Sequence, residues 1–390
     1  MFLSRWIVKQ GRLGLGWDEV ALRSRGLIVK RSMCMVVAFD EEPLAGAPSR
    51  NGGLTRARKD LPAWLPSTAS RSALGSIIPS HHSESQAARI DGKAIADEIK
   101  RSLTHEVSLM KEKVGAVPGI AMVRVGDRKD SILYVRGKEA ACAEVGINSY
   151  VTHMPDSASE AEILEVIDKW NGDARVHGIL VQLPLPSHIK QENVLKGVSL
   201  EKDVDGLHPV NLGRLSGLTN SDPTFVPCTP LGCMELLVRL GIEVEQKKVV
   251  VIGCSSVVGF PTAILLQKSK AEVTVLEPST PNPIDETRKA DIVISATGVP
   301  GLVRGHWLKP GAVVIDVGTS AIEDSEMESG FRVIGDVNFE EAATVASAIT
   351  PVPGGVGPMT IAMLLSNTVK AARRSFGLTT CQGYSSLPIQ

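Results

Sequence analysis

Three polar side chains are spaced so that one face of a helix would carry all of them. Ser131, Tyr134 and Lys138 lie three and four residues apart, and residues at these spacings project from the same side of an α-helix. A lysine amine can exchange protons near neutral pH only when burial and neighbouring groups lower its pKa. Because Tyr and Lys four residues apart also occur as an ordinary solvated pair, the spacing alone leaves a catalytic and a structural interpretation open.

Polar groups also follow a predicted buried strand and a predicted helix. Gln182 comes directly after the apolar run 178–181, at the carboxyl end of the strand, where open α/β sheets bind ligands. Its amide could instead only cap the last backbone groups of that strand. Asp203 and Asp205 share one loop, and Asp203 could be only a turn former, as an aspartate in such a loop often is, so that no more than one of the two need face a ligand.

A turn that contains glycine links a predicted strand to a predicted helix later in the chain. The apolar run 249–252 leads into it, and a strand, a glycine turn and a helix N-terminus together can hold a pyrophosphate on backbone N–H groups. The turn does not match the pattern G-x-G-x-x-G. Its candidate residues are Gly253, Cys254, Ser255, Gly259 and Pro261. A second turn, Pro353-Gly354-Gly355, precedes the last predicted helix and could serve only to reverse the chain.

Helix and strand patterns alternate from residue 87 onward, which is typical of α/β folds with parallel strands. We predict an N-terminal α/β catalytic domain and a Rossmann-type doubly wound dinucleotide-binding domain. The predicted helices span 92–114, 131–145, 161–171, 228–240, 258–268 and 359–374. The predicted strands span 119–125, 149–153 and 178–183 in the first domain, and 248–252, 272–277, 291–296, 312–317 and 332–334 in the doubly wound sheet. The first domain covers 86–226 with a returning helix in 353–376, the second covers 227–352, and 377–390 form a tail.

Residues 1–85 differ in composition from the rest of the chain. They are rich in arginine and, from Ser67 onward, in serine, with little apolar periodicity after residue 30. These features are typical of a transit segment followed by a linker. The acidic residues among them are unusual for such a segment, so a disordered cytosolic extension is the alternative. We predict a mitochondrial protein, with the chloroplast as the second choice.

The overall composition limits the classes of partner. Lys and Arg number 42 against 43 Asp and Glu, for a formal net charge of -1, so we expect no broad attraction to nucleic acid or to an anionic membrane. No apolar run approaches the roughly 20 residues that cross a bilayer. The six cysteines show no CxxC pair and no zinc-type spacing with histidine, so we predict no metal. A small-molecule partner fits best.

Five motifs follow one another along the chain. They are Ser131-x-x-Tyr134-x-x-x-Lys138 with Cys142 and Gly146-Ile147, Val181-Gln182-Leu-Pro-Leu-Pro, Lys202-Asp203-Val-Asp205-Gly206, Pro227-Cys-Thr-Pro230, and Pro351-Val-Pro-Gly-Gly355-Val-Gly-Pro-Met-Thr360. In this order they resemble the bifunctional methylenetetrahydrofolate dehydrogenase/methenyltetrahydrofolate cyclohydrolase family, in its organellar, plant-like form. The resemblance covers residues 87–376.

This resemblance implies oxidation of 5,10-methylenetetrahydrofolate to 5,10-methenyltetrahydrofolate with NAD(P), and hydrolysis of that product to 10-formyltetrahydrofolate. Lys138 would handle the proton of the hydrolysis, and Gln182 would hydrogen-bond to its amine. Tyr134 would stack on the folate ring system, Asp205 would accept hydrogen bonds from the pterin N–H groups, and Ser131 would support the cluster.

The dehydrogenase reaction asks mainly for positioning, because the hydride passes directly from the bridging methylene carbon to nicotinamide C4. The resemblance places the turn of Pro353, Gly354 and Gly355 beside both ligands. We assign to the cofactor site Gly253, Cys254, Ser255, Gly259, Pro261, Glu277, Thr297 and Gly298. The resemblance also implies a tetrahydrofolate derivative as substrate and a homodimer.

One departure from the family pattern concerns the dinucleotide. Family members that prefer NADP, the family default, have a basic residue in the glycine turn and a His-Ser pair after the next strand, where this chain has Cys254 and Glu277. A carboxylate about 20 residues beyond the glycine turn usually accepts hydrogen bonds from the ribose of NAD and repels a 2′-phosphate. We therefore predict a preference for NAD, or poor oxidation with NADP. Alternatively, Glu277 points to solvent and Arg288 or Lys289 supplies the missing positive charge.

Two other functions stay open. A folate-binding paralogue with only cyclohydrolase activity, or with little dehydrogenase activity, would also fit Cys254, Thr319-Ser320 and Leu231, which replaces a residue that is often basic in the family. An oxidoreductase for an unrelated substrate would leave the complete set of Tyr134, Lys138 and their partners unexplained.

Overall fold

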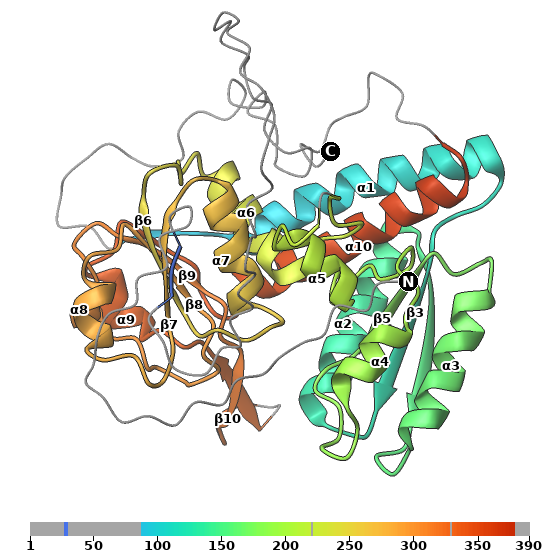
Figure 1. Cartoon of the computed structure of the whole chain (residues 1–390), viewed down its shortest axis with the longest axis horizontal. Helices are drawn as coiled ribbons and strands as arrows, with labels where there is room; N and C mark the ends of the chain where they lie inside the picture. Colours follow the sequence, from blue (N-terminus) through green and yellow to red (C-terminus); the bar gives the residue numbers. More distant parts are fainter. Residues whose placement is uncertain (1–26, 30–86, 220, 328–329, 379–390) are drawn as a thin grey trace, which may run out of the picture.

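Two α/β units make up the described part of the chain (Figure 1). The computed structural model describes residues 27–29, 87–219, 221–327 and 330–378. Most of the predicted targeting segment and linker, 1–85, and most of the predicted tail, 377–390, lie outside the described residues. Within the described ranges, no helix combines the length and the apolar character needed to span a bilayer.

Two long helices, α1 (Gly92–Val114) and α10 (Val356–Ser375), lie side by side and connect the two units (Figure 1). α1 begins where the Asp91 carboxylate accepts a hydrogen bond of 2.9 Å from the backbone N–H of Ala94. It ends at Gly115, whose φ of 70° lies in the left-handed region. Its apolar residues Ile99, Leu103, Val107 and Met110 are buried along one face, and its bounds confirm the helix expected over 92–114.

The first unit has a three-stranded parallel sheet in the order β4-β3-β5. Its strands are β3 (Gly119–Val125), β4 (Asn148–Met154) and β5 (Gly178–Val181). Its helices are α2 (Lys129–Val145), α3 (Glu160–Gly172), α4 (Gln191–Gly197) and α5 (Pro209–Leu215). Ile120 and Met122 of β3 pack in the cluster that includes α1 and α10, whereas Ala121 and Val123 pack with α3. Helices therefore cover both faces of the sheet, as expected for parallel strands.

The second unit has a seven-stranded parallel sheet. In spatial order its strands are β1 (Leu27–Val29), β7 (Glu272–Leu276), β6 (Lys248–Ile252), β8 (Ile292–Ser295), β9 (Val313–Asp316), β12 (Ala348–Ile349) and β2 (Ala88–Arg89). The surrounding helices are α6 (Cys228–Arg239), α7 (Gly259–Lys268), α8 (Pro283–Thr287), α9 (Phe339–Ala343) and the 3-10 helix η2 (Gly305–Trp307). Alternate residues of β6 pack in two separate clusters. The doubly wound sheet that the sequence predicts is confirmed.

This sheet differs from the prediction at four strands, and one of the four, β12, lies where no strand was predicted. The strand expected over 332–334 does not join it: β11 (Phe331–Ile334) pairs antiparallel with β10 (Ser320–Glu323) in a separate ribbon. None of the described residues of this ribbon is fully buried, whereas an inner strand of a parallel sheet is covered on both faces. The positions at the sheet's edges go instead to β2, which comes from the start of the first predicted domain, and to β1, which lies within 1–85.

Candidate active site

Helix α2 places the Lys138 side chain beside Gln182, the residue that follows β5. The Lys138 amine donates a hydrogen bond of 2.8 Å to Oε1 of Gln182. Ser131 is buried on the same helix face, Lys138 is half-buried, and Tyr134 is exposed. A flat exposed ring beside a half-buried amine leaves room for a planar ligand to stack on it.

Hydrogen bonds hold both the backbone and the side chain of Gln182 in place. Its backbone N–H donates to Val123 O of β3 at 2.8 Å, which places it one residue beyond β5. Its side-chain amide nitrogen donates to Leu183 O at 2.7 Å, so its carbonyl oxygen is turned toward Lys138. The amide therefore both caps the end of the strand and orients the amine, which joins the two interpretations that the sequence left open.

The two aspartates of the 202–206 loop have different surroundings. Asp203 is buried and accepts hydrogen bonds from Leu207 N–H at 3.1 Å, His208 N–H at 2.9 Å and the side-chain amide of Asn211 at 2.7 Å. These bonds make it the turn former. Asp205 is half-buried, and its charge acts on Lys138.

The electrostatics of the pair are set by burial. Burial lowers the pKa of Lys138, and the carboxylate of Asp205 opposes that shift. Burial also raises the pKa of Asp205, against the attraction of Lys138 and a hydrogen bond from the Cys228 thiol. An amine whose pKa is below that of an ordinary lysine is suited to proton transfer.

Sequence reasoning missed a buried amide that supports this loop. Asn367 of α10 donates hydrogen bonds to Val204 O at 2.8 Å and Val226 O at 3.2 Å. It thereby joins the Asp205 loop to the segment that precedes α6. The available signal was a polar residue on the apolar face of a predicted helix, because a buried amide requires partners.

The predicted glycine turn lies between β6 and α7 and is tightly packed. Gly253 has a φ of 100°, and a Cβ on Gly259 would overlap the backbone oxygen of Gly253. The Ser255 hydroxyl accepts hydrogen bonds from Val258 N–H at 3.2 Å and Gly259 N–H at 3.4 Å. Cys254 lies in the same glycine turn, and Pro261 lies in the first turn of α7. The chain therefore places backbone N–H groups of a helix N-terminus at the end of the sheet.

Glu277 lies directly after β7 and is buried, with 8% of its surface exposed. The alternative in which it points to solvent is wrong. Its Oε1 has no hydrogen-bond partner among the described residues. Arg288 donates to His306 O at 2.8 Å, and the amine of Lys289 lies 3.2 Å from a Glu286 carboxylate oxygen. Both cations therefore already have partners.

Two further turns carry the remaining predicted residues. Thr297 and Gly298 follow β8, and their backbone N–H groups both donate to Asp336 Oδ2. Gly354, with a φ of 107°, and Gly355 form the turn between β12 and α10, and Gly354 O accepts a hydrogen bond of 2.9 Å from Lys93 N–H. Pro353 precedes them. A Cβ on Gly92 would overlap Gly355 O, so this turn packs directly against the start of α1.

Comparison with known proteins decides the family. The model of the tetrahydrofolate dehydrogenase/cyclohydrolase catalytic domain matches residues 90–205, and the model of its NAD(P)-binding domain matches residues 227–376. The chain is 55% identical over 305 residues to bifunctional protein FolD 4, chloroplastic, of Arabidopsis thaliana, which covers 78% of this chain and 84% of the relative. The chain belongs to the tetrahydrofolate dehydrogenase/cyclohydrolase family.

Other members of the tetrahydrofolate dehydrogenase/cyclohydrolase family agree along most of the chain. Bifunctional protein FolD 1, mitochondrial, of Arabidopsis thaliana is 54% identical over 297 residues, covering 76% of this chain and 84% of the relative. The Trypanosoma brucei methylenetetrahydrofolate dehydrogenase-cyclohydrolase, complexed with NADP cofactor and inhibitor, superposes with a TM-score of 0.72 at 44% identity, covering 75% of this chain and 99% of that chain. The predicted family and fold class are confirmed.

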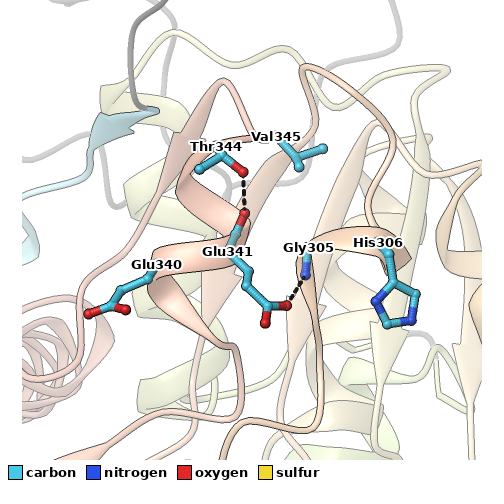
Figure 2. Close-up of a pocket in the computed structure, with 6 residues that line it drawn as sticks. All are labelled: Gly305, His306, Glu340, Glu341, Thr344 and Val345. Atoms are coloured by element: carbon cyan, nitrogen blue, oxygen red, sulfur yellow. Dashed lines mark hydrogen bonds between the residues drawn. The ribbon is translucent and has the colours of Figure 1, made fainter.

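This family member also has a pocket that none of the predicted site residues lines. Figure 2 shows it between η2 and α9, lined by Gly305, His306, Glu340, Glu341, Thr344 and Val345. The Glu341 carboxylate accepts a hydrogen bond of 3.2 Å from Gly305 N–H and pairs with Arg304. The Glu341 carboxylate therefore already has partners within the protein. In the described ranges, no group of three or more His, Cys, Asp or Glu side chains could hold a metal ion.

Proposed function

We propose that this chain oxidises 5,10-methylenetetrahydrofolate to 5,10-methenyltetrahydrofolate with NAD(P), and hydrolyses that product to 10-formyltetrahydrofolate. The observation that supports this most directly is the 2.8 Å hydrogen bond between the Lys138 amine and Gln182, next to Asp205. The family supports both activities. The assignment of individual residues is our inference.

Lys138 is the proton-handling group of the hydrolysis. Water adds to the cationic carbon that bridges N5 and N10 and loses a proton. The bond from that carbon to N5 then breaks and N5 takes up a proton, while the hydroxyl that the water left on the carbon loses its own proton, so that a formyl C=O remains on N10. An amine with a lowered pKa can accept and return that proton. Gln182 keeps the amine in one orientation through its own bonds to Val123 and Leu183.

Tyr134 and Asp205 bind the substrate in this proposal. The exposed ring of Tyr134 stacks on the folate, since flat aromatic surfaces pair favourably. The carboxylate of Asp205 accepts hydrogen bonds from the pterin N–H groups. Ser131, buried on the same face of α2, supports the cluster. The turn of Pro353 to Gly355 borders the folate and the nicotinamide.

Replacing Asp205 with alanine should weaken folate binding roughly ten- to a hundredfold, because a charge-assisted hydrogen bond contributes about 1.5 to 3 kcal/mol. Calorimetric titration with a folate ligand measures this directly. The affinity for the dinucleotide serves as the control and should stay unchanged. An unchanged folate affinity would place the pterin elsewhere.

The dehydrogenase reaction uses the second unit. When bound, the nicotinamide accepts a hydride from the bridging carbon of the folate, and the folate nitrogens stabilise the resulting cation. The chain positions the cofactor: the turn from Gly253 to Pro261 would place the pyrophosphate at the positive end of the α7 helix dipole. Thr297 and Gly298 would line the same site from the end of β8.

NAD(P) is the cofactor that the family implies, and we propose NAD as the preferred form. Oε1 of Glu277, which has no hydrogen-bond partner within the part of the chain that the structure describes, is buried directly after β7. Such an oxygen can accept hydrogen bonds from the ribose hydroxyls of NAD, and its carboxylate repels the 2′-phosphate of NADP. Cys254 adds no positive charge to the turn. NADP stays the alternative from the family resemblance.

The Michaelis constant should be lower for NAD than for NADP in a dehydrogenase assay. The double variant Cys254→Arg with Glu277→His should shift the ratio of kcat/KM toward NADP, because it supplies positive charge and removes the carboxylate. Arg288→Ala is the matched control and should leave the KM for NADP unchanged, since Arg288 bonds to His306 O. A wild-type KM for NADP well below that for NAD would refute the preference.

The domains, cell compartment and assembly are further proposals. We propose a folate-binding domain at 86–226 with 353–376, and a dinucleotide-binding domain at 227–352. Relatives named chloroplastic and mitochondrial support an organellar location, and we keep the mitochondrion as the first choice. A reporter fused to residues 1–85 would distinguish the two organelles. The family resemblance supports a homodimer, which light scattering would test.

A further inference from the structure

A buried carboxylate holds the turn that follows β8. Asp336 has none of its surface exposed. Its Oδ2 accepts hydrogen bonds from Thr297 N–H at 2.6 Å, Gly298 N–H at 3.2 Å and the Ser295 hydroxyl at 3.4 Å. Hydrogen bonds to an ionised acceptor are about twice as strong as neutral ones. Three groups within four residues are thus bound to one oxygen, which fixes the direction in which the chain leaves β8.

A second carboxylate fixes the backbone of the first. Asp316, at the end of β9, accepts hydrogen bonds from Asp336 N–H at 3.0 Å, Gly318 N–H at 2.9 Å and Val337 N–H at 2.9 Å. Burial, reinforced by the charge of Asp336, raises the pKa of Asp316 to about 7. A Cβ on Gly318 would overlap Asp336 Oδ1. Hydrogen bonds to these two carboxylates therefore connect the ends of β8, β9 and β11, and the packing leaves no room for a side chain at Gly318.

The turn held by Asp336 packs against the glycine turn. A Cβ on Gly253 would overlap Ala296 O and lie 3.3 Å from Thr297 N. The Thr297 hydroxyl also accepts a hydrogen bond of 3.1 Å from Val299 N–H. Any shift of the 297–299 turn would therefore change the shape of the surface next to Gly253, where the proposed pyrophosphate site begins.

We propose that Asp336 is a positioning residue for the dehydrogenase reaction, because it holds the Thr297–Gly298 turn against the glycine turn in the geometry that binds the dinucleotide. This inference rests on the cofactor site proposed above. The hydrogen bonds described for Asp336 all lie within the second unit, and none reaches Lys138 or Asp205. Loss of its carboxylate should impair oxidation and spare hydrolysis.

The test compares both reactions in the same full-length variants. Asp336→Ala should raise the KM for the dinucleotide roughly tenfold or more, since small misplacements at a reacting centre are costly. Its KM for the folate and its cyclohydrolase rate should stay within about twofold of the wild type. Asp336→Asn should recover most of the dinucleotide affinity, because its amide oxygen can still accept both backbone hydrogen bonds.

Asn338→Ala is the matched control. Asn338 lies two residues further along and caps α9 through a hydrogen bond of 3.1 Å from Glu341 N–H. Its loss should lower stability without changing the KM for the dinucleotide. A merely structural role of Asp336 would make the two variants behave alike.

The remaining outcomes separate the role of Asp336 from the cofactor site on which it depends. Gly259→Ala reports separately on the proposed cofactor site. If it raises the KM for the dinucleotide and Asp336→Ala does not, the inference about Asp336 is overturned and the site stands. If neither variant changes it, the proposed site is wrong as well. Loss of both activities in Asp336→Ala and in the milder Asp336→Ser, assayed in the cold, would show that Asp336 holds the whole fold and would overturn the inference.

Discussion

Replacing Lys138 with methionine should abolish hydrolysis of 5,10-methenyltetrahydrofolate, with a loss in kcat of about 10²- to 10⁴-fold, which is the usual contribution of a positioned acid-base group. Methionine keeps much of the side-chain volume but carries no proton. Hydride transfer does not use this amine, so the dehydrogenase reaction should continue and its methenyl product should accumulate. The decay of methenyl absorbance measures the loss.

Lys129→Met is the matched control for that variant. Lys129 is exposed at the start of α2, so the change removes the same charge from the same helix without touching Gln182. The wild-type pH profile checks the assignment independently. Because the pKa of Lys138 is lowered from the ordinary 10.5, the rate should rise with pH and level off below that value. Hydrolysis by Lys138→Met at the wild-type rate would show that another group handles the proton.

Gly259→Ala should lower dehydrogenase kcat/KM by roughly a hundredfold or more, because displacing groups at a reaction site by about 1 Å can cost that much. The new Cβ would overlap the backbone oxygen of Gly253. Gly253 has a φ of 100°, so its backbone cannot move away from the new Cβ without distorting the turn that precedes α7. The cyclohydrolase rate, measured without a dinucleotide, should be retained.

Gly172→Ala provides the comparison for Gly259→Ala. Gly172 lies at the end of α3, and a Cβ there would meet nothing within 4 Å. Both activities should survive that change. A Gly259→Ala enzyme that oxidises the folate normally would mean that the dinucleotide does not bind at this turn.

Local patterns in the sequence were sufficient to predict most elements. The helix over 92–114 and the strands over 119–125 and 248–252 have the predicted bounds, because an apolar repeat, a capping residue or a continuous apolar run marks each one. No such signal marks β2 and β12, which have two residues each. Their pairing joins segments about 260 residues apart, and only the packed sheet brings them together.

The candidate site also contains residues that could be predicted from the sequence and residues that could not. The residues with unusual chemistry, Lys138, Gln182 and Asp205, were predicted from spacing, from the end of a strand and from the resemblance. Asn367 and Asp336 were not predicted, because their importance comes from the backbone groups that they bind across large sequence distances. An apolar environment makes such a group significant, and burial is not visible in a single sequence.

The most direct test of the whole account is a spectrophotometric assay of the purified chain. 5,10-Methylenetetrahydrofolate is supplied first with NAD and then with NADP, and 5,10-methenyltetrahydrofolate is supplied afterwards without any dinucleotide. We expect reduction of the dinucleotide in the first assay and hydrolysis to 10-formyltetrahydrofolate in the second. Folate binding without turnover in either assay would contradict the proposed bifunctional enzyme and favour a folate-binding paralogue.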